Sequence, residues 1–332
     1  MIRPLFPQLP IAFSKEVASA RDHGMPLVAL ESHLIVHGAP YPRNFRLGCD
    51  LEAIIREGGA VPVTIAVIGG TLHAGLEREE LDALARDPGA LKVSRADLAF
   101  AIAEGLTGVT TVAATMIVAA RLGIKVFATG GIGGVHRGVE ESFDISADLD
   151  ELARTGVIVV SAGAKSILDI PKTLEALETR GVPVVTFGSQ EFPAFWSRSS
   201  GLHSSLSLDS PAAIARFQRV REQMGLEGGV LVANPVPGAD EIPRAEIEAH
   251  IEQALENVRR KGISGKAVTA YLLSEISALS GARSAKTSIA LVENNARLAT
   301  QIAVAFASLD AGVDKTAPEG SAHQTRRPLC AQ

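Results

Sequence analysis

The chain has 332 residues, 46% of them hydrophobic and 21% charged, which is the composition of a globular protein with a large core. Its formal net charge of −5 and its aromatic content of 4% give no basis for a nucleic-acid surface, which needs a basic patch or rings that stack on bases. The two cysteines, Cys49 and Cys330, are too few for a disulfide framework or a cysteine zinc site, so a reducing cytoplasm is the expected location.

Short apolar runs rich in valine and isoleucine alternate with longer amphipathic stretches as far as residue 240, and only helical patterns follow. Alternation of this kind is typical of a parallel sheet with helices on both faces. We therefore predict an α/β protein with three α/β/α layers, a largely parallel central sheet and a helical C-terminal part. The strands are predicted over 26–30, 61–68, 125–128, 157–161, 182–186 and 229–233. The helices are predicted over 43–57, 94–104, 109–122, 171–180, 243–261, 265–280 and 287–309.

No break in composition divides the chain, so residues 1–311 are predicted to form a single α/β/α domain. Residues 312–332 lack periodicity and are predicted to form a loosely packed tail. No apolar run is long enough to span a bilayer, and residues 1–13, with three prolines, do not resemble a signal peptide. We therefore expect no membrane partner.

The densest chemical signal is the stretch 128–148, "ATGGIGGVHRGVEESFDISAD", in which four glycines fall within five residues after a predicted strand. Glycines there allow backbone N–H groups to approach a ligand closely. Read from Gly131, the dinucleotide-binding fingerprint requires a sixth-place glycine where His136 stands, so a dinucleotide site is disfavoured. The pair His136–Arg137 after the glycines favours an anion or sugar site, and a tight turn is the alternative.

Oxygen-bearing side chains alternate over residues 144–150 in the manner of a calcium loop. The sixth position is Leu149 instead of glycine and the twelfth is Thr155 instead of glutamate, which excludes an EF-hand. A hard-cation site that uses one or two carboxylates and waters remains open. The alternative is a solvated loop that caps a helix, and such a run taken alone favours it.

Lys165 follows the predicted strand 157–161 among small residues, at the predicted N-terminus of a helix. The helix dipole and burial would lower the pKa of this amine, and a neutral amine can attack a carbonyl to form a Schiff base. Glu31 ends the first predicted strand, where a carboxyl in a parallel sheet is well placed for acid–base chemistry. Lys92 could reach a phosphate. A solvated lysine is the alternative for Lys165 and Lys92, and a capping glutamate for Glu31.

Several long motifs occur together in a fixed order: "ALESHLIVHGAPYPRN", "VFATGGIGGVHRG", "FDISADL", "GAKSILDIPKTLEALETRGVPV" and "EFPAFWSRSSG". In these motifs the chain resembles the pseudouridine-5'-phosphate glycosidases over roughly residues 13–308. The resemblance implies an α/β/α fold, a homotrimer and a divalent metal, Mn²⁺ or alternatively Mg²⁺. It also implies a lyase- or hydrolase-type enzyme that makes or breaks the carbon–carbon bond between C1 of ribose 5-phosphate and an aglycone.

The resemblance also assigns roles to residues. It implies that Lys165 forms the Schiff base with the ring-opened sugar, that Glu31 transfers protons and that His136 assists ring opening. It places the metal on Asp144. The contacts that it implies to the sugar, the phosphate or the aglycone are those of Lys92, Val112, Thr129, Ser146, Ala147 and Asp148.

The chain departs from the family pattern at three places, one of which is a threonine–proline pair that reads Thr269–Ala270. A threonine that normally follows the first strand is His33, and an asparagine of the late motif is Ser288. An asparagine amide pairs with a uracil edge in a way that a serine hydroxyl does not, and the His33 ring could stack on an aromatic ligand. These changes favour the branch of the family that attaches ribose to aromatic polyketides such as alnumycin. The alternatives are an ordinary pseudouridine-5'-phosphate glycosidase, which releases uracil and ribose 5-phosphate, and a non-catalytic sugar-phosphate-binding homologue.

Overall fold

The computed structural model describes residues 9–263, 265 and 267–313. Within them, strands pair into one sheet in the order β1-β4-β3-β2-β7-β8-β11-β9-β10, with β6 beside β3 and β5 beside β6. The strands are β1 (Ile11–Phe13), β2 (Leu27–Glu31), β3 (Val61–Ile68), β4 (Thr71–Ala74), β5 (Leu91–Val93), β6 (Gly108–Thr110), β7 (Val126–Ala128), β8 (Ile158–Ser161), β9 (Val184–Phe187), β10 (Leu206–Leu208) and β11 (Val230–Ala233).

Helices connect and cover these strands. They are α1 (Lys15–Asp22), α2 (Ser32–His37), α3 (Arg43–Glu57), α4 (Arg78–Ala85), α5 (Leu98–Ala103), α6 (Val112–Arg121), α7 (Val139–Ser142), α8 (Ala147–Arg154), α9 (Ile170–Thr179), α10 (Pro211–Gln223), α11 (Arg244–Lys261), α12 (Ala267–Leu279) and α13 (Arg283–Val313), with a 3₁₀ turn at Gly238–Asp240.

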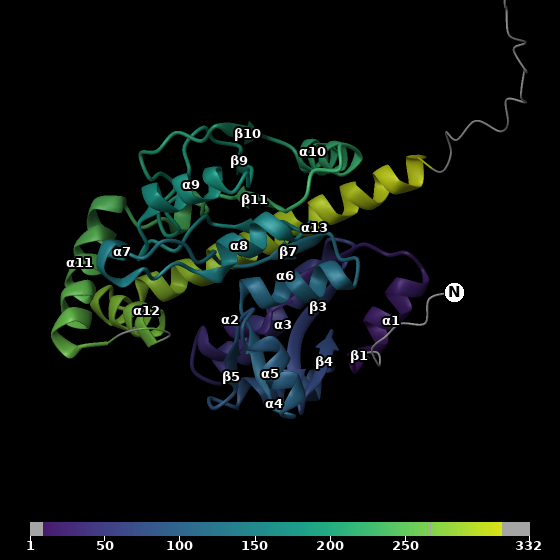
Figure 1. The fold of residues 1–332 in the computed structure, drawn as a ribbon, viewed down its shortest axis with the longest axis horizontal. Helices are drawn as coiled ribbons and strands as arrows, with labels where there is room; N and C mark the ends of the chain where they lie inside the picture. The colour runs from purple at the N-terminus through teal and green to yellow at the C-terminus, as the bar shows by residue number, and fades with distance from the viewer. Residues whose placement is uncertain (1–8, 264, 266, 314–332) are drawn as a thin grey trace, which may run out of the picture.

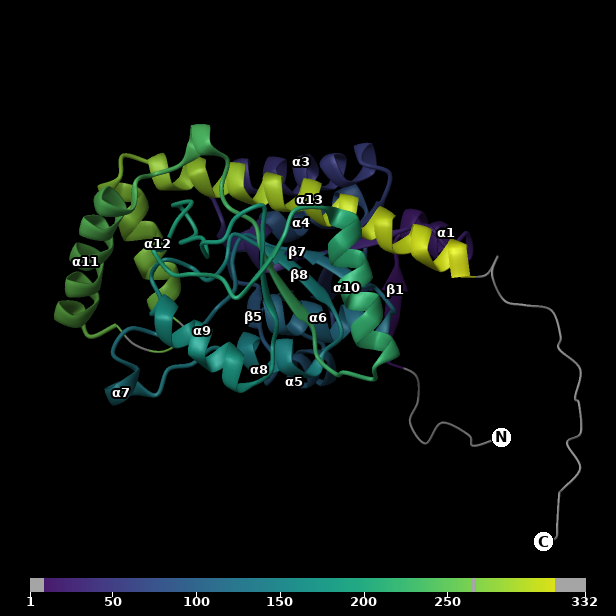
Figure 2. The same ribbon diagram turned by 90° about the horizontal axis from the view of Figure 1, so that it is seen from above.

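The molecule has three layers, as predicted. Seen from above, α13 and α3 run along one side of the strands, and α5, α6, α8 and α9 lie along the other (Figure 2). The strands between them are apolar on both faces, and four of the five residues of β2 are buried. Burial on both faces is the expected state of a parallel sheet between two helical layers. Helices α11 and α12 stand together at one end of the molecule (Figure 1).

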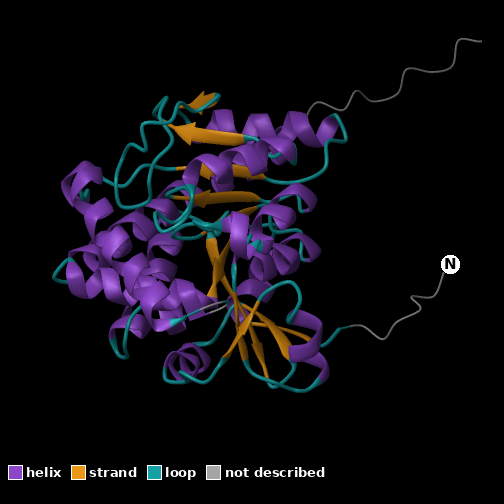
Figure 3. Ribbon diagram, turned by 60° about the vertical axis from the view of Figure 1, so that its left-hand side comes forward, coloured by secondary structure: helices purple, strands orange, loops and turns teal. Residues whose placement is uncertain are grey.

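The sheet is parallel at every pairing except those of β3 with β4 and with β6, which are antiparallel. Figure 3 shows that the sheet is strongly twisted: the strands drawn nearest the N-terminus of the chain cross the other strands at a large angle. A progressive turn of this kind follows from the right-handed twist of each strand. The prediction of a largely parallel α/β sheet is confirmed.

All six predicted strands are present, and five short ones were missed. The missed strands have three or four residues each, and none of them lies in a continuous apolar run such as those that marked the predicted strands. Two predicted helices were too long. Residues 108–110 form β6, so the helix predicted over 109–122 begins at Val112, and the one predicted over 94–104 begins at Leu98.

The C-terminal part is helical, as predicted. Helix α13 extends through residues 312 and 313, the first two of the predicted tail, and residues 314–332 lie outside the described part of the chain. In the part of the chain that the structure describes, no helix combines the length and the apolar character needed to cross a bilayer.

Two loops that leave neighbouring strands run side by side above the sheet. The glycine loop (residues 129–137) follows β7, and the lysine loop (residues 162–169) follows β8. Ile132 N–H donates to Gly163 O at 3.0 Å, and Lys165 N–H donates back to Ile132 O at 3.2 Å. Asp169 N–H donates to Val135 O at 2.9 Å, so each loop fixes the backbone of the other.

Gly163 is required where the lysine loop turns. Its φ is +85°, and a Cβ there would lie 2.8 Å from a ring carbon of Phe192 and 3.0 Å from Pro193 O. An L-residue would therefore be strained in its backbone and crowded in its side chain.

Replacing Gly163 by alanine should lower the free energy of unfolding by about 2–5 kcal/mol, because left-handed strain costs ~1–2 and overpacking ~1–3 kcal/mol. The matched control is Gly24→Ala, where φ is +62° and no atom lies within 4 Å of the added carbon. Only the strain of ~1–2 kcal/mol should appear there. Urea unfolding of both variants measures the difference, and equal losses would contradict the steric account.

Candidate active site

Glu31 is a buried carboxyl at the end of β2, with only 7% of its surface exposed. Thr129 Oγ1, at the start of the glycine loop, donates to Glu31 Oε1 at 2.5 Å. Burial raises the pKa of Glu31, while the charge of Lys165 and the Thr129 hydrogen bond act in the opposite direction. A carboxyl with a raised pKa and one fixed oxygen is suited to hold and deliver a proton.

Lys165 lies in the lysine loop, and its Nζ donates to Gly131 O at 2.6 Å. The prediction that Lys165 stands at a helix N-terminus is wrong. Helix α9 begins at Ile170 with Asp169 as its N-cap, because Asp169 Oδ1 accepts from Lys172 N–H at 3.1 Å. The loop and the carbonyl of Gly131 orient the Lys165 amine, and the helix dipole does not.

His33 and Lys92 lie close enough for the charge of Lys92 to act on the His33 ring. His33 is partly buried in α2, and Lys92 lies in β5. Burial lowers the pKa of His33 to about 3, with further contributions from the charges of Lys92, His37 and Lys165. The His37 ring centroid is 5.0 Å from that of His33. The His33 imidazole is therefore neutral at physiological pH.

Asp148 joins three elements. Its Oδ1 accepts from Ala113 N–H at 3.0 Å in the first turn of α6, and its Oδ2 accepts from Gly133 N–H at 2.8 Å. Ser146 Oγ accepts from Asp148 N–H at 3.2 Å and caps α8, which begins at Ala147. The run over 144–150 thus includes a helix cap, the alternative that its sequence also allowed.

The N-terminus of α6 contains a residue that the sequence did not single out. Thr111 precedes Val112, the first residue of α6, and its Oγ1 is buried without a hydrogen-bond partner among the described residues. An unsatisfied buried hydroxyl costs free energy unless a ligand or a water satisfies it. It lies in the β6–α6 connection, and β6 pairs with the strand that carries Lys92.

Asp144 is the carboxylate that the sequence proposed for a metal. Its Oδ2 lies 3.8 Å from His136 Nδ1, and 39% of its side chain is exposed. Burial lowers the pKa of His136, against the opposing charge of Asp144. No group of three His, Cys, Asp or Glu residues in the described part of the chain could hold a metal. The donor set fits a hard cation with one carboxylate and several waters, and it does not fit zinc.

Ser288 is engaged within the protein. Trp196 Nε1 donates to Ser288 Oγ at 2.8 Å, and the hydroxyl donates to Ser284 O at 2.8 Å. Trp196 is buried, and its neighbour Phe195 packs against the glycine loop so closely that a Cβ on Gly131 would lie 2.6 Å from the ring. The Ser288 hydroxyl therefore holds Trp196, the neighbour of the ring that packs against the glycine loop.

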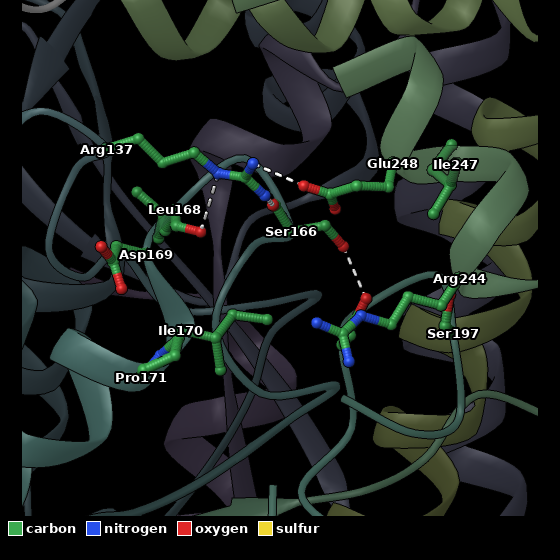
Figure 4. A pocket seen from close by; sticks show the side chains of 11 residues that line it. Arg137, Ser166, Leu168, Asp169, Ile170, Pro171, Ser197, Arg244, Ile247 and Glu248 are labelled. Carbon is green, nitrogen blue, oxygen red and sulfur yellow. Dashed lines mark hydrogen bonds and ion pairs between the residues drawn. The ribbon is translucent and has the colours of Figure 1, made fainter. Parts of the chain in front are cut away.

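A cavity of about 270 Å³ lies beside the lysine loop, and neither Lys165 nor Glu31 lines it. Arg137 dominates one wall (Figure 4). Its guanidinium donates to Ser166 O at 3.1 Å and Leu168 O at 3.4 Å, and it pairs with Glu248 of α11 at 2.5 Å. Helix α11 is thereby attached to the loop that carries Lys165.

Comparisons with known proteins agree with this architecture. The family model described as indigoidine synthase A like protein matches residues 16–305. Pseudouridine-5'-phosphate glycosidase 1 of Rhizobium johnstonii is 71% identical over 92% of this chain and 96% of its own length. The pseudouridine-5'-phosphate glycosidase of Mesorhizobium japonicum is 62% identical over 87% of this chain and 95% of its own.

The chain belongs to the pseudouridine-5'-phosphate glycosidase family. Among solved structures, the prealnumycin C-glycosynthase AlnA in complex with ribulose 5-phosphate is similar, with a TM-score of 0.85 and 37% identity. The match covers 92% of this chain and 100% of that one. An indigoidine synthase A-like protein of Thermotoga maritima gives a TM-score of 0.84 at 36% identity, with the same coverage.

The preference for ribosylation of an aromatic polyketide is wrong. Relatives that are 56–71% identical carry the name pseudouridine-5'-phosphate glycosidase, whereas the C-glycosynthase is 37% identical. Both residues that suggested the preference interact with the protein itself. The Ser288 hydroxyl bonds to Trp196, and the His33 ring lies near Lys92 and His37.

Stability at acidic pH should depend on His33. The unfolded imidazole, with a pKa of about 6.5, takes up a proton as the pH falls, while the folded one, with a pKa of about 3, does not. Folding stability is therefore lost as the pH falls from about 6.5 toward 3, and His33 accounts for ~2 kcal/mol of the loss at pH 5. Urea unfolding at pH 7 and pH 5 should show a smaller loss for His33→Thr. An equal loss in both proteins would contradict this role of His33.

Proposed function

We propose that this protein cleaves the carbon–carbon glycosidic bond of pseudouridine 5'-phosphate with water, releasing uracil and ribose 5-phosphate. The observation that carries the proposal is a buried carboxyl, Glu31, that lies within electrostatic range of the amines of Lys165 and Lys92. The names of the relatives at 56–71% identity support the substrate.

The chemistry explains why a lysine is needed. An ordinary glycosidase expels an oxygen leaving group with two carboxyls, whereas a C-glycoside has carbon in that place. In the proposed first step, the Lys165 nitrogen bonds to C1 of the sugar and the bond from C1 to the ring oxygen breaks. The Lys165 nitrogen gives up a proton as it bonds and the ring oxygen takes one up. We propose that His136 carries the proton between them, and the sugar is then open and attached to Lys165.

In the second step the bond between C1 of the sugar and C5 of uracil breaks. Its electron pair goes to C5 of uracil, which takes a proton from Glu31. C1 is left double-bonded to the Lys165 nitrogen, and water then hydrolyses this imine to free ribose 5-phosphate and the amine. Glu31 is suited to the protonation because burial raises its pKa, so the carboxyl holds a proton at higher pH than a solvated one.

The phosphate of the substrate is proposed to bind between Lys92 and the N-terminus of α6, at Val112. The backbone N–H groups and the positive end of a helix favour an anion there. The unsatisfied Thr111 hydroxyl supports this assignment, because a phosphate oxygen would give it a partner. The loop at Ser146 and Ala147 is held beside α6 by the hydrogen bonds of Asp148, and we propose that it contacts the sugar.

A divalent cation, Mn²⁺ or Mg²⁺, is proposed to bind Asp144 with water ligands, and such an ion supplies positive charge that orients substrate oxygens. We also propose that the enzyme is a cytoplasmic homotrimer, as the resemblance to the family and the scarcity of cysteine suggest.

Lys165 should form a covalent adduct with ribose 5-phosphate. Borohydride reduction followed by peptide mass mapping should place the adduct on Lys165, and Lys165→Ala should lower the turnover of pseudouridine 5'-phosphate by at least about 10³-fold. The control is Lys172→Ala, since Lys172 is exposed and pairs with Glu140 and Asp169. An adduct on Lys92 with an active Lys165→Ala variant would overturn the mechanism. Sugar binding without uracil release would favour a non-catalytic homologue.

Removal of divalent cations should stop turnover, and Mn²⁺ or Mg²⁺ should restore it. Asp144→Asn should weaken Mn²⁺ binding measured by electron paramagnetic resonance, because the single carboxylate ligand is lost. The matched control is Asp150→Asn in the same acidic run, where the carboxylate pairs with Arg180 at 2.7 Å. Unchanged Mn²⁺ binding in Asp144→Asn would contradict the assignment.

A further inference from the structure

Asn295 is a fully buried polar side chain on α13, the helix that crosses one face of the sheet. Its Nδ2 donates to Thr129 O at 2.8 Å and also lies 3.4 Å from Gly130 O. Its Oδ1 accepts from Asn234 Nδ2 at 3.0 Å. Both ends of the amide are therefore satisfied at the start of the glycine loop.

The residues around Asn295 on α13 make its polarity unexpected. Leu291, Ala299 and Ile302 belong to the core, and an apolar side chain at position 295 would join the same layer. A buried amide is tolerated only where hydrogen bonds compensate for its lost water. The hydrogen bond from the Asn295 amide fixes the backbone carbonyl of Thr129, and the hydroxyl of the same threonine donates to Glu31.

These contacts form one line along the carboxyl edge of the sheet. Glu31 ends β2, Thr129 follows β7 and Asn234 follows β11, while Asn234 N–H donates to Ser161 O of β8 at 2.7 Å. The four strands are neighbours in the order β2-β7-β8-β11. Asn295 bridges this line from the helical layer, so α13 is coupled to the position of the Glu31 carboxyl.

We propose that Asn295, supported by Asn234, is a positioning residue that fixes Thr129 so that its hydroxyl donates to Glu31 Oε1 and leaves Oε2 for proton transfer. Proton transfer needs its donor within hydrogen-bond reach of the reacting atom, and groups held by a second layer of hydrogen bonds keep that geometry. The proposal rests on the proposed function and extends it to Asn295 on α13 and to Asn234, which follows β11, as residues that act through Thr129 and not on the substrate.

The consequence can be measured as a pH shift. The Thr129 hydrogen bond lowers the pKa of Glu31 against the larger effect of burial, and the charged groups that face Glu31 are Lys165, Asp148 and Lys92. Without a well-placed Thr129 hydroxyl, the pKa of Glu31 rises further. The limb of the pH dependence of kcat that Glu31 governs should then move to higher pH by about 0.5–1 unit, the equivalent of one hydrogen bond.

The test is a double-mutant cycle on the full-length protein, with pseudouridine 5'-phosphate as substrate and uracil release as readout. Thr129→Val removes the hydroxyl at constant shape, so the limb of the pH profile that it moves is the one governed by Glu31. Thr129→Ser keeps a hydroxyl and should return that limb to its original pH. Asn295→Leu should move the same limb in the same direction and lower kcat by about 10–100-fold, with little change in KM. The double variant Thr129→Val/Asn295→Leu should move the limb no further than Thr129→Val does, because both act on one hydrogen bond.

Asn294→Leu is the matched control, since Asn294 is the preceding residue and donates to Pro235 O at 3.3 Å. It should leave the pH limb in place whatever its effect on the melting temperature. If Asn295→Leu does not fold, Asn295→Ser tests the same point, because the shorter side chain does not reach Thr129 O.

Two results would overturn the proposal: an Asn295 variant that loses melting temperature without a shift of the limb, and shifts that add in the double variant. Failure of the unmodified protein to release uracil at any pH would be a different outcome. It would overturn the proposed function, and this inference with it.

Discussion

The burial of the Glu31 carboxyl is the constraint on which the rest of the site depends. A carboxylate removed from water is costly, and its protonated form is favoured unless partners compensate. Here one hydroxyl, from Thr129, and two nearby cations, Lys165 and Lys92, oppose the effect of burial without cancelling it. The site therefore contains an acid that is held rigidly and surrounded by little water.

The parallel sheet brings these groups together. The strands β2, β7 and β8 end at the same edge, so Glu31, the glycine loop and the lysine loop leave the core side by side. Open parallel sheets bind ligands at that edge for the same reason. The hydrogen bonds between the two loops then fix Lys165 relative to Gly131, although 34 residues separate them along the chain.

Two helices, α13 and α11, contact the loops of the candidate site from outside it. Helix α13 reaches the glycine loop through Asn295, and α11 reaches the lysine loop through the ion pair of Glu248 with Arg137. Both contacts end on backbone carbonyls of the loops, so they restrain the chain without entering the site. The C-terminal helices, which follow the last strand in the sequence, thus restrain the loops of the candidate site.

The α/β/α class, the six predicted strands and the family can be recognised in the sequence, because continuous apolar runs and long motifs are local signals. The sequence also singled out Glu31, Lys165 and Asp144, whose residue types suit the proposed chemistry. What these groups contact, in contrast, depends on how distant parts of the chain pack together. The helix start assumed at Lys165 lies five residues later, the Ser288 hydroxyl bonds to Trp196, and Thr111 and Asn295 carried no signal in the sequence. The hydrogen bond of Trp196 with Ser288 joins residues 92 apart in the chain, and that of Asn295 with Thr129 joins residues 166 apart. Such contacts follow from how the chain packs, and no local pattern encodes them.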